Sequence, residues 1–162
     1  IETSSLRDSL PPDLEIVRAM PVSSAEVGAS PTLIYPDHGT VRELFDYCGN
    51  ALPVDDEACF SQGSVLACVY CWFFSLFDAL IQANASDNLP HPINPQLVMG
   101  MARGAAQLAL ERIDTPPRDI ATAIATEGTY SKLGLDLLQQ ENAFLAWQQA
   151  CDLLQQQLAS ED

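Results

Sequence analysis

Positive charge is scarce in this chain of 162 residues. The sequence holds one lysine, Lys132, and six arginines against 22 acidic residues, which gives a net charge of −15. A surface of this sign repels the phosphates of nucleic acids and the head groups of anionic membranes. The composition therefore argues against nucleic acid and membranes as partners, and the acidity most simply keeps the protein in solution.

Residues that bind metals or form disulfides are also few. His38 and His91 are isolated, with no cysteine or carboxylate at ligand spacing, so no metal site is predicted. The five cysteines are an odd number, which argues against a disulfide framework and favours a reducing, cytoplasmic environment. Cys68 and Cys71 have redox-motif spacing but lack a preceding strand and turn. We interpret them as small core residues one helical turn apart.

Long apolar runs and a signal peptide are absent as well. The longest apolar run, residues 65–74, is shorter than the roughly 20 residues that span a bilayer, so no transmembrane helix is predicted. The apolar fraction of 48% and the charged fraction of 18% are those of a globular protein. The chain begins with Ile1 and contains no G-x-G-x-x-G phosphate-binding motif. We expect it to be the back portion of a larger protein.

The first third of the sequence alternates strand and helix patterns. Asp37 is a good N-cap for a helix, and Gly49 stands in the position that ends one. The expected elements are a helix end at residues 3–10, strands at 14–20, 32–35 and 51–54, and a helix between Asp37 and Gly49. Together they predict a partial α/β unit over residues 1–57.

The pattern of residues 58–162 predicts helices throughout, so the predicted fold class is mostly α. The expected helices run from Ser61 or Ser64 to Ala83, over 96–112, from Pro116 to Ala125, and from Ser131 onward with a break near Glu141 and Asn142. The first helix is apolar on most of its circumference and must be covered on several sides. Gly100 and Gly104 invite close helix contact. The last helix carries an apolar seam in steps of three and four, which predicts a partner helix: Phe144, Trp147, Cys151, Leu154 and Leu158.

One stretch indicates a family. Residues 15–21, Glu-Ile-Val-Arg-Ala-Met-Pro, resemble the Arg-(Val/Ala)-Met-Pro-Asn step of pyrroline-5-carboxylate reductases, which leads there to a helical dimerisation domain. Val54-Asp55, residues 78–80 and the small-residue helix around Gly104 follow in the family's order. The resemblance implies that residues 1–57 are the end of a dinucleotide-binding domain and that residues 58–162 form a homodimer. It further implies NAD(P)H as cofactor, held mostly by a missing N-terminal portion.

The resemblance also implies site residues, though several motifs differ. Cofactor-binding residues would be Met20, Pro21 and Val22, where Val22 replaces the family's asparagine. A Ser-Gly-Ser-Gly-Pro run that faces the ligand falls on the apolar residues 66–70, and residues 62–64 could serve instead if the helix starts earlier. The motif Ser-Pro-Gly-Gly-x-Thr falls on residues 126–131, where the substrate-binding candidates are Thr126, Gly128, Thr129 and Ser131. Glu127 adds a negative charge there, and no catalytic residue is identified.

Three functions are compatible with these patterns. The first is the C-terminal portion of an NAD(P)H-dependent oxidoreductase that reduces an imine or a related small substrate. The second is a non-catalytic dimeric paralogue that serves as a binding or scaffold protein, which the altered motifs favour. The third is a helix-seam interaction module without a ligand. The residues encoded before Ile1 would discriminate best, since a G-x-G-x-x-G roughly 80 to 100 residues upstream favours the first function.

Overall fold

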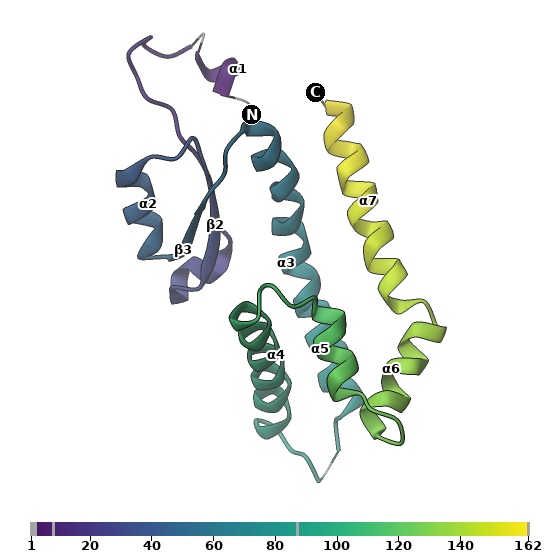
Figure 1. Cartoon of the computed structure of the whole chain (residues 1–162). Helices are drawn as coiled ribbons and strands as arrows, with labels where there is room; N and C mark the ends of the chain where they lie inside the picture. Colours follow the sequence, from purple (N-terminus) through teal and green to yellow (C-terminus); the bar gives the residue numbers. More distant parts are fainter. Residues whose placement is uncertain (1–2, 8, 87, 162) are drawn as a thin grey trace. The chain divides into compact units, whose positions relative to one another are not determined.

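The computed structural model describes residues 3–7, 9–86 and 88–161, and consists of a small sheet followed by long helices (Figure 1). In chain order the elements are α1 (Thr3–Arg7), β1 (Arg18–Met20), the 3-10 helix η1 (Ser23–Val27), β2 (Ser30–Tyr35), α2 (Gly39–Asp46), β3 (Gly49–Pro53), α3 (Glu57–Ala83), α4 (Ile93–Glu111), α5 (Pro117–Ile124), α6 (Tyr130–Gln140) and α7 (Ala143–Glu161). The predicted fold class, mostly helical with a small α/β part in front, is confirmed.

The chain divides into two compact units. The first comprises the residues up to Trp72 together with those from Leu153 onward, and the second comprises residues 73–152. Helix α3 contributes its first part to one unit and its second part to the other, without a break in the helix. The predicted domain boundary between residues 57 and 58 stays a prediction; α3 begins there.

Strand β2 is the centre of the three-stranded sheet. It pairs antiparallel with β1 and parallel with β3, which it reaches through α2. Alternate side chains of β2 point to opposite faces, and Ser30, Thr32 and Ile34 are all fully buried. Gly49 opposes Ser30 in the register, at a φ of 150°. A Cβ at Gly49 would lie 2.3 Å from the Ser30 carbonyl oxygen, so this strand start requires glycine.

The ends of α2 differ from the prediction. The N-cap is His38 rather than Asp37, because the His38 backbone is extended and its Nδ1 accepts a hydrogen bond from the Val41 N–H at 3.4 Å. His38 is therefore not isolated, and its Nε2 lies 3.2 Å from a carboxylate oxygen of Glu15. Asp37 instead pairs with Arg42 of α2. The helix ends at Asp46, so the predicted stop at Gly49 is wrong and Gly49 begins β3.

Helix α3 starts earlier than either predicted position, Ser61 or Ser64. The Asp56 carboxylate accepts a hydrogen bond from the Cys59 N–H at 2.6 Å, and this satisfies one amide of the first turn. Asp56 thus caps α3. Because the start moved by more than one turn, residues 62–64 lie inside the helix.

The predicted break near Glu141 is confirmed. Helix α6 ends at Gln140, Asn142 adopts a left-handed φ of 56°, and α7 begins at Ala143. Part of the apolar seam of α7 packs within the same chain, because the ring centroids of Trp147 and Phe73 lie 5.8 Å apart. Both residues belong to the second compact unit.

Much apolar surface of the helices is not covered by the chain itself. Helix α3 is long and apolar enough to cross a membrane by length and composition, with only 6% of its apolar window buried, so the prediction that no segment reaches that length was wrong. A helix packed among other helices meets the same criterion. Cys68 and Cys71 are exposed rather than in the core of the chain. A Cβ added at Gly100 or Gly104 would meet nothing within 4 Å, so the predicted close helix contact is not made within the described chain.

Candidate functional site

The segment that carries the cofactor candidates is held by buried hydroxyls. Val22 follows β1 and Pro21, and its N–H donates a hydrogen bond to the Ser30 Oγ at 3.0 Å. That hydroxyl also lies 3.1 Å from the Thr32 hydroxyl, and the side chains of Ser30 and Thr32 are both fully buried on β2. A buried hydroxyl with these partners fixes the backbone where it leaves the sheet. Met20 and Val22 are half-buried and Pro21 is exposed, so the segment presents accessible atoms on a fixed backbone.

A second polar contact lies beside this segment. The Ser23 hydroxyl, at the start of η1, is 3.4 Å from the Tyr70 hydroxyl of α3. Tyr70 occupies the position at which the resemblance places the last residue of the ligand-facing run. The sequence did not single out this pair, because residues 23 and 70 are joined only by the fold.

The ligand-facing run itself has a different structure from the one the family motif implies. Residues 66–70 lie in the middle of α3, where backbone N–H groups bond to carbonyls one turn earlier. Residues 62–64 do not replace them, since they lie in the second turn and the Ser64 hydroxyl donates to the Phe60 carbonyl at 2.9 Å. Neither stretch offers the unpaired amides of a helix N-terminus. Residues 62–64 therefore offer no free amides to a ligand, and their role as a ligand run stays a prediction.

An ion pair joins β1 to the first turn of α3. The Arg18 guanidinium lies 2.8 Å from the Glu57 carboxylate and 4.3 Å above the Phe60 ring. The same carboxylate accepts hydrogen bonds from the Thr3 N–H and hydroxyl, at 2.9 and 3.0 Å. The Thr3 amide first, and then Arg18, hold the pKa of Glu57 below its usual value, against the opposing effect of burial. These contacts fix the strand that leads into the Met20–Val22 segment.

The substrate-binding candidates lie in one turn between α5 and α6. Gly128 has a left-handed φ of 81°, and Thr129 is the N-cap of α6. The Thr129 hydroxyl accepts from the Lys132 N–H at 3.2 Å and donates to the Thr126 carbonyl at 2.7 Å. Thr126, Gly128 and Ser131 are exposed and Thr129 is half-buried. The structure thus brings the four candidates together at the start of a helix, which attracts negative charge.

Charged side chains flank this turn. The Lys132 ammonium contacts both carboxylate oxygens of Asp136, at 2.5 and 2.6 Å. The pKa of Lys132 is raised, chiefly by this hydrogen bonding to Asp136 and least by the charge of Glu127. Glu127 itself is exposed. The carboxylate of Glu127 therefore stands in the electrostatic neighbourhood of the α6 N-terminus.

The cofactor candidates belong to the first compact unit and the substrate candidates to the second. Each group of candidates is therefore described within its own unit. In the part of the chain that the structure describes, no cluster of His, Cys, Asp or Glu could hold a metal ion. All five cysteines are free.

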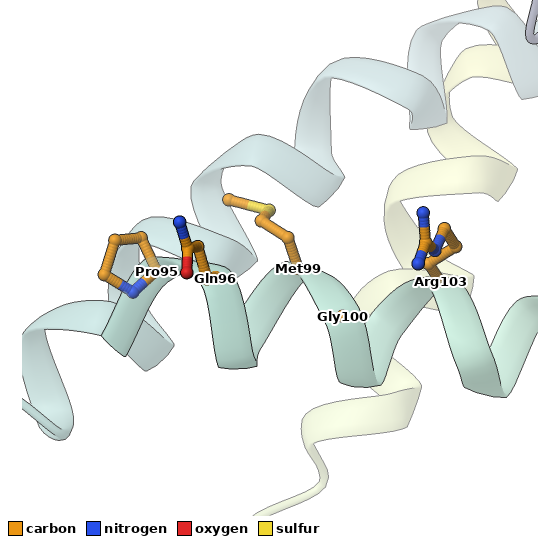
Figure 2. A pocket seen from close by; sticks show the side chains of 5 residues that line it. All are labelled: Pro95, Gln96, Met99, Gly100 and Arg103. Atoms are coloured by element: carbon orange, nitrogen blue, oxygen red, sulfur yellow. The ribbon is translucent and has the colours of Figure 1, made fainter. Parts of the chain in front are cut away.

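The structure also contains a shallow hollow along α4 that the sequence did not indicate (Figure 2). Its volume is about 380 Å³, and its lining residues project from one side of the helix: Pro95, Gln96, Met99, Gly100 and Arg103. It lies in the second unit and includes none of the candidate site residues. The hollow is open because nothing packs on Gly100.

The Met-Pro step after β1 is followed by the strand–helix–strand unit β2–α2–β3 and then by a run of long helices. No family model matches the chain. Its sequence is 29% identical over 116 residues to the pyrroline-5-carboxylate reductase of Mycobacterium leprae and 28% identical over 121 residues to that of Mycobacterium tuberculosis. These alignments cover 67% and 70% of this chain, and it spans about 40% of the length of either relative.

Solved structures agree in fold over nearly the whole chain. The reductase of Streptococcus pyogenes matches with a TM-score of 0.83 at 21% identity, covering 99% of this chain and 64% of that one. The NADP-bound reductase of Plasmodium falciparum matches with a TM-score of 0.82 at 17% identity, covering 98% and 66%. The chain is thus similar to pyrroline-5-carboxylate reductases in sequence and in fold, as a divergent relative.

Proposed function

We propose that the intact protein is an NAD(P)H-dependent reductase that acts on a carbon–nitrogen double bond. The observation that carries the proposal is the sequence match to two mycobacterial reductases, in the same order of elements as the reductase structures. One of those structures, from Plasmodium falciparum, has NADP bound. Bound NAD(P)H would supply the hydride, and the protein would supply orientation and exclusion of water.

The roles of the residues follow from their positions. Met20, Pro21 and Val22 would contact the cofactor, because their backbone is fixed by Ser30 and remains accessible. Thr126, Gly128, Thr129 and Ser131 would contact the substrate at the α6 N-terminus. These assignments rest on the family resemblance together with the local geometry of each segment.

The cofactor can be tested first. The chain as given has no G-x-G-x-x-G, so we expect it not to bind NAD(P)H with micromolar affinity. The intact protein is expected to bind it. Calorimetric titration of both forms provides the test, and tight one-to-one binding by the 162-residue chain would contradict the assignment of the cofactor site to a preceding segment.

The substrate provides the second test. Because α3 is helical throughout residues 62–70, we expect the intact protein to turn over 1-pyrroline-5-carboxylate poorly while it oxidises NAD(P)H with other cyclic imines. Stopped assays at 340 nm with a panel of imines would show this. Efficient turnover of 1-pyrroline-5-carboxylate would show that the alignment of the first long helix is wrong.

We further propose a homodimer. The α3 helix exposes apolar side chains of the kind that obligate homodimer interfaces bury: Leu66, Phe73, Phe74, Leu76 and Leu80.

A second candidate function is a non-catalytic dimeric paralogue that binds or scaffolds. Two observations favour it, the unbroken helix at the ligand-facing run and the charge of Glu127 in the substrate turn. If the intact protein binds NAD(P)H but turns over no imine in the panel, this second function replaces the first. Turnover of any member of the panel excludes it.

A further inference from the structure

Two cysteines on α3, Cys68 and Cys71, have no role in the proposed reductase. They lie one helical turn apart, within the first compact unit, and both are exposed free thiols. The Cys71 thiol donates a hydrogen bond to the Cys68 carbonyl oxygen at 3.2 Å, so its sulfur is turned back toward the turn that holds Cys68. Side chains three residues apart lie on the same face of a helix, which makes the two thiols neighbours.

The pair belongs to a stripe of polar and small side chains along α3. The members of the stripe follow one another in steps of four and three, and all but the first are exposed: Ser64, Cys68, Cys71, Ser75, Asp78 and Gln82. The apolar residues Leu66, Phe73 and Leu80, which we propose to be buried in a homodimer, lie about half a turn around the helix from this stripe. Both thiols therefore stay accessible to a small solute in such a dimer.

A helix brings two such thiols near to each other but does not hold them at bonding distance. Cβ atoms three residues apart in a helix are separated by about 5–6 Å, whereas a disulfide requires about 3.5–4.5 Å. Closing a disulfide here draws the two Cβ atoms together by about 1–2 Å and disturbs the backbone hydrogen bonds of that turn. Disulfides that are strained or exposed are the ones most easily reduced again.

The same turn carries a contact to the segment that follows β1. Tyr70 lies between the two cysteines, and its hydroxyl is 3.4 Å from the hydroxyl of Ser23, which follows the Met20–Val22 segment directly. Tyr70 and Ser23 both belong to the first unit. A hydrogen bond of this length is near its limit, so a displacement of about 1 Å away from Ser23 breaks it.

We propose that Cys68 and Cys71 form a reversible dithiol–disulfide switch, which low-molecular-weight disulfides such as oxidised glutathione close. The thiolate of one cysteine attacks a sulfur of the oxidant, forms a mixed disulfide and releases one molecule of glutathione. The thiolate of the other cysteine then attacks this mixed disulfide, forms the bond between Cys68 and Cys71, and releases a second glutathione. The two cysteines lose two protons and two electrons, which the oxidant takes up as it becomes two thiols. Closing the switch separates Tyr70 from Ser23.

Peptide mapping of the intact protein tests whether the bond forms. The protein is incubated with oxidised glutathione, the remaining thiols are alkylated, and the protein is digested with chymotrypsin, which cuts after Tyr70. We expect the two peptides on either side of this cut to remain joined until dithiothreitol is added. Cys59→Ser is the matched control and should form the same bond, because Cys59 is also exposed on α3 but has no cysteine one turn away.

Hydrogen exchange, followed by mass spectrometry, tests the consequence for the fold. We expect the oxidised wild type to exchange about two- to tenfold faster than the reduced protein over residues 66–72 and 22–27, the size of one lost hydrogen bond. The Cys68→Ser variant can only bind glutathione at Cys71, so the same oxidant should leave the exchange of residues 22–27 unchanged. Circular dichroism of the reduced proteins checks that both variants fold.

The inference is overturned if both cysteines take up glutathione without forming a bond to each other, or if neither reacts. It is also overturned if the bond forms and the exchange of residues 22–27 is unchanged, or if oxidised Cys68→Ser exchanges there as fast as the oxidised wild type. None of these measurements requires NAD(P)H or an imine, so their outcome is independent of the proposed function.

Discussion

Replacing Phe74 by alanine is the most direct test of the proposed homodimer. Phe74 lies on α3 and is 54% exposed in the chain alone, with one edge against Phe77. An aromatic side chain buries about 150–250 Å², so about 100 Å² of Phe74 is available to a partner. At about 25 cal/mol per Å², its burial contributes about 2.5 kcal/mol per copy. A two-fold dimer contains the contact twice, which gives about 5 kcal/mol.

That free energy corresponds to a loss of at least a thousandfold in dimer affinity. We expect the wild-type chain to sediment as a dimer at micromolar concentration in low and high salt, and Phe74→Ala to sediment mainly as a monomer. Tyr47→Ala is the matched control, because Tyr47 is 87% exposed beside α2, outside the proposed helical interface. A folded wild-type monomer, or a Phe74→Ala variant as dimeric as the control, would refute the reasoning. Trp147→Asp is unsuitable, since Trp147 packs on Phe73 within the chain.

Four further substitutions test the stability of the first unit, measured by urea denaturation. Gly49→Ala should cost about 3 kcal/mol or more, because its φ is positive and its Cβ would overlap the Ser30 backbone. Gly63→Ala should stay within about 1 kcal/mol of wild type, because its Cβ would meet only a movable methyl of Leu33 and alanine favours the helix; equal costs would contradict this account. Ser30→Ala should cost about 1–3 kcal/mol, since it leaves the half-buried Val22 N–H without its acceptor, and a neutral effect would mean that other contacts hold the segment. Glu57→Gln should cost about 1 kcal/mol at pH 7, and this cost should shrink as the pH falls through the folded pKa of Glu57. The pKa of Glu57 is lowered in the folded state, so its contribution is present above about 4.5 and disappears as the pH falls through the folded value; a pH-independent cost would refute the assigned ion pair.

The elements that the sequence predicted best are those with a strong local signal. The break between α6 and α7 was predicted from Glu141 and Asn142, and Asn142 does adopt the left-handed conformation that asparagine tolerates. The predicted helix starts were wrong where more than one residue could act as the N-cap. Asp37 and Ser61 are good caps by residue type, yet His38 and Asp56 have the backbone position from which a side chain reaches the third amide.

The candidate site was predictable only in part. Thr126 to Ser131 are close in sequence, so a motif could place them in one turn. The contact between Ser23 and Tyr70 and the ion pair between Arg18 and Glu57 join residues far apart along the chain. No spacing rule connects such residues, because their proximity depends on how α3 packs beside the sheet of the first unit. The charge of Glu127 and its position just before a helix were both visible in the sequence, since a helix was predicted from Ser131 onward.

The contacts of Glu57 also bear on the order in which the first unit folds. The strand–helix–strand segment from β2 to β3 closes over a short stretch of chain. Glu57, by contrast, joins Arg18 across 39 residues and Thr3 across 54. Closing the longer loops costs about 1 kcal/mol more in chain entropy than closing the sheet. The Glu57 contacts offset this cost only after the sheet has formed and shortened the effective loop. We therefore expect the sheet and α2 to form first and the Glu57 contacts to form last, so that substitutions at Glu57 accelerate unfolding while leaving the folding rate nearly unchanged.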